Sequence, residues 1–158
     1  MTRSVFLGMC LSALAAAPLP AEKSPRPPKQ DVLYLMHASN LIETEVAEAK
    51  EERRKDDTAY VVNGASSPAR TPMAEPIFVL DSKSIRPEQL QLFRLEVKNG
   101  RREAVISNKK RGKDRPLHLS MKRLGEGVYR IEANEYLQNG QYAITPEGSN
   151  QVFLFEVY

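Results

Sequence analysis

The feature that most constrains this chain is its last twenty residues, NGQYAITPEGSNQVFLFEVY. Apolar and other residues alternate from Tyr142 to Ile144 and again from Phe153 to Val157, which is the period of a half-buried β-strand. The segment TPEGSN between the two runs is rich in turn residues. Chain ends usually fray, so an apolar pattern that continues to Val157 predicts a paired core strand rather than a tail.

A tyrosine stands at the start of the first of these two runs. Tyr142 comes five residues after Leu137 and two after Gly140, so it opens a late strand directly after a turn. Greek-key sandwiches build their tyrosine corner in this way, with the hydroxyl bonded back to the connecting backbone. We therefore predict a hydrogen bond from the Tyr142 hydroxyl to the preceding segment.

The segment 90–107 contains the clearest hairpin signal, because Asn99-Gly100 is a strong two-residue turn. The resulting register places four apolar residues on one face: Phe93, Leu95, Ala104 and Ile106. It also sets like charges opposite one another, which costs free energy. A slipped register or a longer loop therefore stays open as an alternative.

Strand signals of this kind recur along most of the chain. The segment 116–134 alternates around glycine turns and predicts a second hairpin, and shorter runs at 31–39, 58–64 and 76–81 predict single strands. About eight to ten short strands separated by turn residues indicate an antiparallel β-sandwich of the immunoglobulin-like or Greek-key type. A closed β-barrel is the less favoured alternative.

The segment 40–57 is ambiguous. Asn40 with Glu43 resembles a helix capping box, and Glu51 with Lys55 forms a helical i,i+4 pair. The apolar stripe of such a helix is narrow, however, and the alternation around Val46 suits a strand. The sequence thus predicts at most one short helix near 41–55, with a long strand as the alternative.

The start of the chain predicts export. Arg3 precedes an uncharged stretch over 5–17, which is too short to cross a bilayer, and small residues and prolines follow. This is the pattern of a secretory signal peptide, predicted here as 1–21; an uncleaved N-terminal anchor is the alternative. Residues 22–30 are proline-rich and predict a disordered leader, so the β-sandwich domain is expected over 31–158. After cleavage no cysteine and no further membrane-spanning run remain.

Basic residues gather between residues 98 and 123, where ten lysines and arginines stand against two acidic residues, a local excess of +8. A basic rim on a sandwich suits docking to polyanions such as acidic glycans or lipid headgroups. The alternative is that the charges only keep exposed strands from pairing with other chains. The candidate binding residues are Arg101, Arg102, Lys109, Lys110, Arg111, Lys113 and Arg115.

The proline-containing loop at 65–76 is a secondary candidate site, because loops on rigid sandwiches often carry binding residues. Arg70 and Met73 are its candidate contacts. The prolines also have a simpler interpretation, namely that they fix the shape of the loop.

Residue patterns for catalysis are sparse. Beyond residue 21 the chain has no thiol and no G-x-S-x-G motif, and its two histidines are His37 and His118. Metal-binding patterns such as H-x-x-x-H or a calcium loop are missing from the sequence. We therefore expect no cofactor and no metal, and a small hydrolase that uses one of the histidines is kept as the alternative to a non-enzymatic protein.

The pattern L-x-x-G-x-Y-x-[IL]-x-P-x-G-x-N-x-V-F-x-F-x-V runs from Leu137 to Val157. Through this pattern and the segment GASSPARTPMAEPIF, the chain resembles small exported bacterial β-rich proteins of unassigned function. The resemblance implies an exported β domain, and it carries over no functional residue because its motifs are strand and turn residues.

These observations together predict a periplasmic or secreted, non-enzymatic interaction module of the cell envelope. Its expected partner is an envelope protein or an anionic envelope polymer, and intracellular nucleic acid is excluded by the predicted export. A structural subunit of an exported assembly, which would self-associate through its strand edges, is the third hypothesis.

Overall fold

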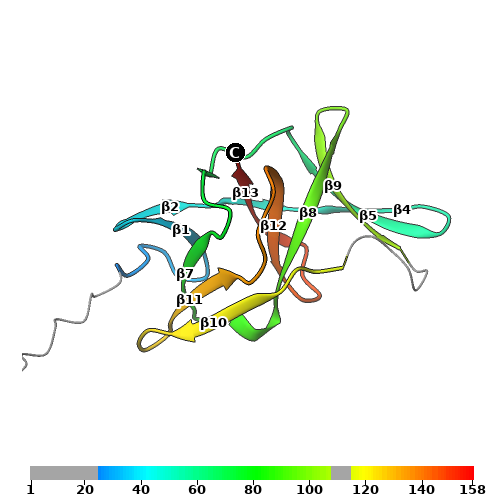
Figure 1. The fold of residues 1–158 in the computed structure, drawn as a ribbon. Coiled ribbons are helices and arrows are strands. Elements are labelled where there is room, and N and C mark those ends of the chain that lie inside the picture. Colours follow the sequence, from blue (N-terminus) through cyan, green and yellow to red (C-terminus); the bar gives the residue numbers. More distant parts are fainter. Residues whose placement is uncertain (1–24, 108–114) are drawn as a thin grey trace, which may run out of the picture.

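Two β-sheets pack face to face in the computed structural model, which describes residues 25–107 and 115–158 (Figure 1). The smaller sheet has five antiparallel strands in the order β10 (Leu119–Arg123), β11 (Val128–Ala133), β7 (Ile77–Asp81), β1 (Leu33–His37) and β2 (Asn40–Glu43). The predicted fold class, a mostly β, antiparallel, sandwich-like fold, is confirmed. No helix of the described residues has the length and apolar character needed to cross a membrane.

The larger sheet contains the hairpin at 90–107 and the end of the chain. Its strands follow the order β3 (Glu45–Glu48), β13 (Gln151–Val157), β12 (Gly140–Pro146), β8 (Leu90–Lys98), β9 (Arg101–Ser107), β5 (Asp57–Asn63) and β4 (Lys50–Arg53). The two-residue β6 (Arg70–Thr71) pairs in parallel with β13, and a single 3-10 turn, η1, spans Pro87–Gln89.

Residues 40–53 form the three strand segments β2, β3 and β4, so a helix near 41–55 is wrong and the strand alternative is right. Each segment pairs with a different strand: β2 with β1, β3 with β13, and β4 with β5. These backbone partners override the local helical propensity, which is only a weak preference. Because of this splitting and the short β6, the described residues contain thirteen strand segments, more than the eight to ten that the sequence predicted.

The larger sheet curls back on itself. Its two outer strands in the pairing order, β3 and β4, are consecutive in the chain and are separated only by Ala49. One continuous segment therefore pairs with β13 through its first half and with β5 through its second. Figure 1 shows the result: β9, β5 and β4 lie to one side of β8, β12 and β13, and the five-stranded sheet lies to the other.

Two apolar cores follow from this arrangement. The first lies between the two sheets and contains Phe78, Tyr142, Phe153 and Phe155, with Phe78 and Phe155 in edge-to-face contact at 4.9 Å between ring centroids. The second lies inside the curl and is built from smaller residues: Ala49, Val62, Phe93, Leu95, Ala104, Ala143, Val152 and Leu154. Strands β8, β12 and β13 contribute to both cores, one from each face.

The end of the chain behaves as predicted. Strand β13 pairs with β12 on one side and with β3 on the other, and Phe153 and Phe155 are fully buried. The Tyr142 hydroxyl donates a hydrogen bond of 2.6 Å to the carbonyl oxygen of Gln138, which confirms the predicted bond to the connecting backbone. Burial raises the pKa of Tyr142, so this hydroxyl keeps its proton.

The predicted hairpin register is confirmed for the three residue pairs next to the turn. Glu96 lies opposite Glu103, and Lys98 lies opposite Arg101, as the turn at Asn99-Gly100 requires. The like charges are tolerated because Lys98 forms ion pairs with both glutamates, at 2.7 Å and 3.2 Å. The hairpin therefore needs neither a slipped register nor a longer loop to accommodate the like charges.

Residues 25–30 lie against the domain in the structure, whereas the sequence predicted a disordered leader over 22–30; residues 22–24 lie outside the described chain. Pro27 is buried, and Arg26 forms an ion pair of 2.8 Å with Asp81, whose side chain is 6% exposed. Lys29 pairs with Glu43 at 2.8 Å. An extended proline-rich segment needs no ladder of its own hydrogen bonds and can lie flat on a sheet.

Asp31 ends this packed segment and organises the turn after β7. Its carboxylate accepts hydrogen bonds from the Ser84 hydroxyl and from three backbone N–H groups, those of Lys83, Ser84 and Ile85. Burial raises the pKa of Asp31, but these four donors outweigh it and lower the pKa to about 2. The ionised carboxylate thus stabilises the folded state.

A pH dependence follows, because a depressed pKa contributes stability above the unfolded value, 3.8, that is lost as the pH falls through about 2. We expect Asp31→Asn to lower the free energy of unfolding at neutral pH by about 1–2 kcal/mol after allowance for solvent screening. The difference between the two proteins should shrink between pH 4 and pH 2. Urea unfolding across this range measures it, and a constant difference would contradict the assignment.

Candidate functional site

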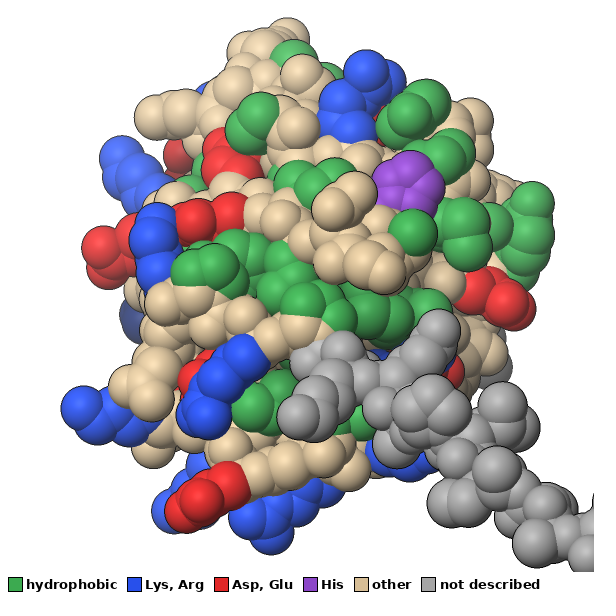
Figure 2. Space-filling view, turned by 90° about the vertical axis from the view of Figure 1, so that its left-hand side faces the viewer, with side chains coloured by type: hydrophobic (Ala, Val, Ile, Leu, Met, Phe, Trp, Pro, Cys, Tyr) green, Lys and Arg blue, Asp and Glu red, His purple; other side chains and the backbone are tan. Residues whose placement is uncertain are grey.

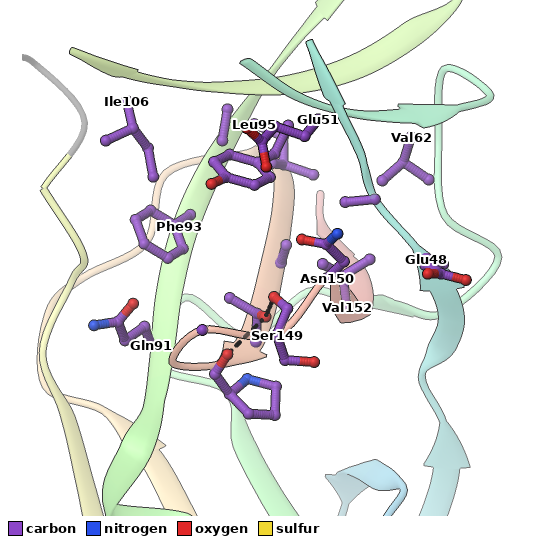
Figure 3. Close-up of a pocket in the computed structure, with 17 residues that line it drawn as sticks. Glu48, Glu51, Val62, Gln91, Phe93, Leu95, Ile106, Ser149, Asn150 and Val152 are labelled. Atoms are coloured by element: carbon purple, nitrogen blue, oxygen red, sulfur yellow. Dashed lines mark hydrogen bonds between the residues drawn. The ribbon is translucent and has the colours of Figure 1, made fainter. Parts of the chain in front are cut away.

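The curl of the larger sheet encloses a cavity of about 620 Å³ (Figure 3). Its apolar wall is formed by Ala49, Tyr60, Val62, Phe93, Leu95, Ala104, Ile106, Ala143 and Val152. The loop between β12 and β13, with Gly148, Ser149 and Asn150, forms part of its border. Figure 3 shows Phe93 and Leu95 on one side of the space and Val62 and Val152 on the other.

Strand alternation explains why these residues line the cavity. Successive side chains of a strand point to opposite faces, so Phe93 and Leu95 of β8 share the inner face of the curl. Ala104 and Ile106 of β9 line the same cavity, so the four residues predicted to share a face do so. The sequence therefore located one wall of the cavity correctly, without indicating that a cavity exists.

Small side chains keep the space open. Ala104 of β9 and Ala143 of β12 occupy inward positions on their strands, and Ala49 lies buried between β3 and β4; a larger residue at any of these positions would take up space in the curl. Interiors are normally packed with few voids larger than a water molecule. The cavity is open to solvent on the side of its exposed lining residues, and its volume falls within the 300–1,000 Å³ range of typical ligand pockets.

Arg102 closes the curl at the end away from the cavity. It lies on β9 two residues before Ala104, so it points to the same inner face, and its side chain is 1% exposed. It forms a bidentate pair with Glu45 of β3, at 2.8 Å and 2.9 Å, and donates to the carbonyl oxygens of Asn63 and Gly64. The pair ties β9 to β3 across the interior.

Burial thus removes Arg102 from the candidate basic binding surface. The sequence analysis grouped it with exposed arginines because composition alone does not show which face of β9 it occupies. Burial raises the pKa of Glu45, and hydrogen bonds from Arg102 and Ser67 more than compensate and lower it. The pair is therefore ionised and serves as a structural clamp.

The other basic candidates are dispersed in the described part of the chain. Arg101 pairs with Glu52 at 3.1 Å, and Arg115 is exposed and borders a separate, smaller cavity of about 260 Å³. Four of the candidates lie outside the described residues: Lys109, Lys110, Arg111 and Lys113. The described residues therefore show no single surface that unites the basic set.

The secondary loop candidate is held against the end of the chain. Arg70 pairs with Glu156 at 3.1 Å and lies over the ring of Tyr158, with 4.3 Å to its centroid. Met73 is 48% exposed. The loop at 65–76 thus gains its shape from β6, which pairs with β13, as well as from its prolines.

The two histidines do not meet. Both are exposed, His37 at the end of β1 and His118 just before β10, and strands β7 and β11 separate these two strands in the sheet. Neither histidine lines the two cavities described above. Within residues 25–107 and 115–158, no group of three or more metal-ligating side chains comes together.

An open apolar area also lies on the surface. Figure 2 looks at the side of the molecule to which β1 and β2 extend and shows a band of hydrophobic side chains flanked by charged ones. Such a band suits contact with a macromolecule, whereas the cavity inside the curl has walls on several sides and suits a small ligand.

Comparison with known proteins leaves the cavity as the main guide to function. The chain matches no family model, no curated protein and no solved structure. The resemblance to exported bacterial proteins therefore stays a prediction based on the sequence.

Proposed function

We propose that the protein is a non-enzymatic binding module that holds an apolar ligand in the cavity of its curled sheet. The single observation that carries this proposal is the cavity of about 620 Å³, whose apolar wall is formed by Ala49 and by side chains from the five strands β5, β8, β9, β12 and β13. Ligand pockets are concave and combine apolar walls with polar groups, and this cavity has an apolar wall with polar residues at its border.

The fold supports this role in two further ways. The clamp between Arg102 and Glu45 ties β9 to β3 across the interior of the curl, which holds two walls of the cavity in position. The alanines at inward positions keep the volume of the cavity free. The surrounding structure has no polar cost to offset, because every buried side-chain N or O atom of the described residues has a hydrogen-bond partner.

The predicted signal peptide places this module outside the cytoplasm, at the cell envelope or beyond it. Its partner would then be an apolar or amphipathic component of the envelope, or a protein that presents one. The earlier hypothesis of an anionic polymer depends on Lys109, Lys110, Arg111 and Lys113, and the described members of the basic set lend it little support.

A blocked cavity tests the proposal. We expect the neutral fluorophore N-phenylnaphthylamine to bind the protein with increased emission, and Ala104→Phe to weaken this binding by at least about tenfold because the phenyl ring occupies the volume. The variant should remain folded, since it fills space rather than creating it. The matched control is Ala65→Phe, which adds the same ring to an exposed loop position. Equal binding by all three proteins would contradict the proposal.

A further inference from the structure

The border of the cavity carries charge of only one sign. Among its seventeen lining residues the charged ones are Glu48 and Glu51, and no lysine or arginine is present. Glu48 is exposed and forms no ion pair with another described residue. Glu51 lies opposite Tyr60 of β5 and Glu48 lies opposite Gln151 of β13. Figure 3 accordingly shows the two glutamates at different places around the space.

The pairing of β4 with β5 places an aromatic ring beside one of these carboxylates. Glu51 lies directly opposite Tyr60, and both line the cavity. A carboxylate next to an aromatic face attracts a cation twice, through its charge and through the quadrupole of the ring. Arg53 pairs with Glu51 at 3.1 Å, but its side chain is 87% exposed, so solvent screens it and it offers weak competition.

From this charge pattern we propose that the cavity takes a ligand with an apolar body and a cationic end, such as an alkyl amine. This inference rests on the proposed function and adds the class of ligand. The apolar body lies against Phe93, Leu95 and Val152, and the ammonium group lies at the border beside Glu51 and Tyr60, with Glu48 as a more distant negative charge. An alkyl carboxylate of the same length fits the same walls, but its charge meets two like charges.

The test compares three ligands of equal chain length: decylamine, decan-1-ol and decanoate, each used below its aggregation concentration to displace N-phenylnaphthylamine at neutral pH and low salt. We expect decylamine to bind about tenfold more tightly than decanoate, with the alcohol between them, since contact with the exposed Glu51 carboxylate contributes about 1 kcal/mol of attraction for the amine and a similar repulsion for decanoate. Raising the salt concentration should reduce the difference, because exposed charges are screened.

Two double variants, each of which removes two negative charges, separate the effect of the cavity carboxylates from the effect of the protein's net charge. Glu48→Gln combined with Glu51→Gln should bring the affinities for decylamine and decanoate to within about twofold of each other. Glu75→Gln combined with Glu126→Gln alters two exposed carboxylates outside the cavity and should keep the preference for the amine.

The outcomes are distinguishable. If decan-1-ol fails to bind, the proposed function fails with the inference. If the alcohol binds and the amine shows no advantage over decanoate, the inference alone is overturned. It is also overturned if decanoate binds more tightly and loses this advantage when Lys109, Lys110, Arg111 and Lys113 are replaced by glutamine, because the basic segment would then determine the ligand.

Discussion

Replacing Phe155 by alanine is expected to lower the free energy of unfolding by about 3–5 kcal/mol, the range for an aromatic residue lost from a packed core. Phe155 is fully buried between the two sheets. It contacts the ring of Phe78 edge to face and stacks on Tyr142 at 5.4 Å between centroids. The surrounding strands are fixed on both faces, so they cannot collapse into the space that the ring leaves.

The matched control is the same substitution at Phe93, which lines the cavity and is 9% exposed. Because one side of this ring already faces open space, Phe93→Ala should cost less, about 1–3 kcal/mol, while it weakens binding of the fluorophore. Urea unfolding of both variants gives the comparison. An equal loss of stability at the two positions would contradict the description of one packed core and one hollow core.

The second large effect is expected from Arg102→Ala, which should destabilise the protein by about 2–4 kcal/mol. The substitution removes the bidentate partner of the Glu45 carboxylate, which keeps its hydrogen bond from Ser67, and the Arg102 donors to the carbonyl oxygens of Asn63 and Gly64. Since Glu45 is 25% exposed, water recovers part of the loss, and the estimate lies below that for a fully buried pair.

Arg101→Ala provides the control, because the neighbouring arginine is 42% exposed and pairs with Glu52 at the surface. Exposed pairs contribute about 0–1 kcal/mol. Replacing Arg102 and Glu45 together by methionine should cost less than the sum of the two single replacements, since neither charge is then left alone. Strict additivity in chemical denaturation would show that the two side chains do not interact.

The sequence predicted the hairpin at 90–107 well because its signal is local. The Asn99-Gly100 turn determines the register, and the register determines that Phe93 and Leu95 share a face with Ala104 and Ile106. The corner at Tyr142 was predictable for the same reason, since its hydrogen bond reaches back only four residues.

The curl was not predictable in this way, because it depends on contacts between distant segments. Residues 45–53 bridge β13 and β5, and local propensity at these positions favoured a helix. One feature of the sequence does indicate the curl: adjacent apolar residues such as Phe153-Leu154 and Leu92-Phe93 are typical of strands that are buried on both faces. A two-layer sandwich needs only alternation, so these pairs indicated a third layer.

The charge pattern was misleading for a related reason. Arg101 and Arg102 are neighbours in the sequence, yet one faces outward to Glu52 and the other faces the interior. Composition counts both toward a basic surface, whereas strand alternation separates them. A residue's face depends on the register of its whole strand, and only the pairing of β9 with β5 and β8 established it.

The most direct test of the account is to locate a bound apolar ligand. Methyl groups of labelled alanines serve as reporters in solution NMR with decan-1-ol: Ala49, Ala104 and Ala143 line the cavity, while Ala69 and Ala133 lie in the core between the sheets. We predict nuclear Overhauser contacts from the alkyl chain to the first group and none to the second. Contacts restricted to other residues, or no contacts at saturating alcohol, would contradict the claim that the curled sheet holds the ligand.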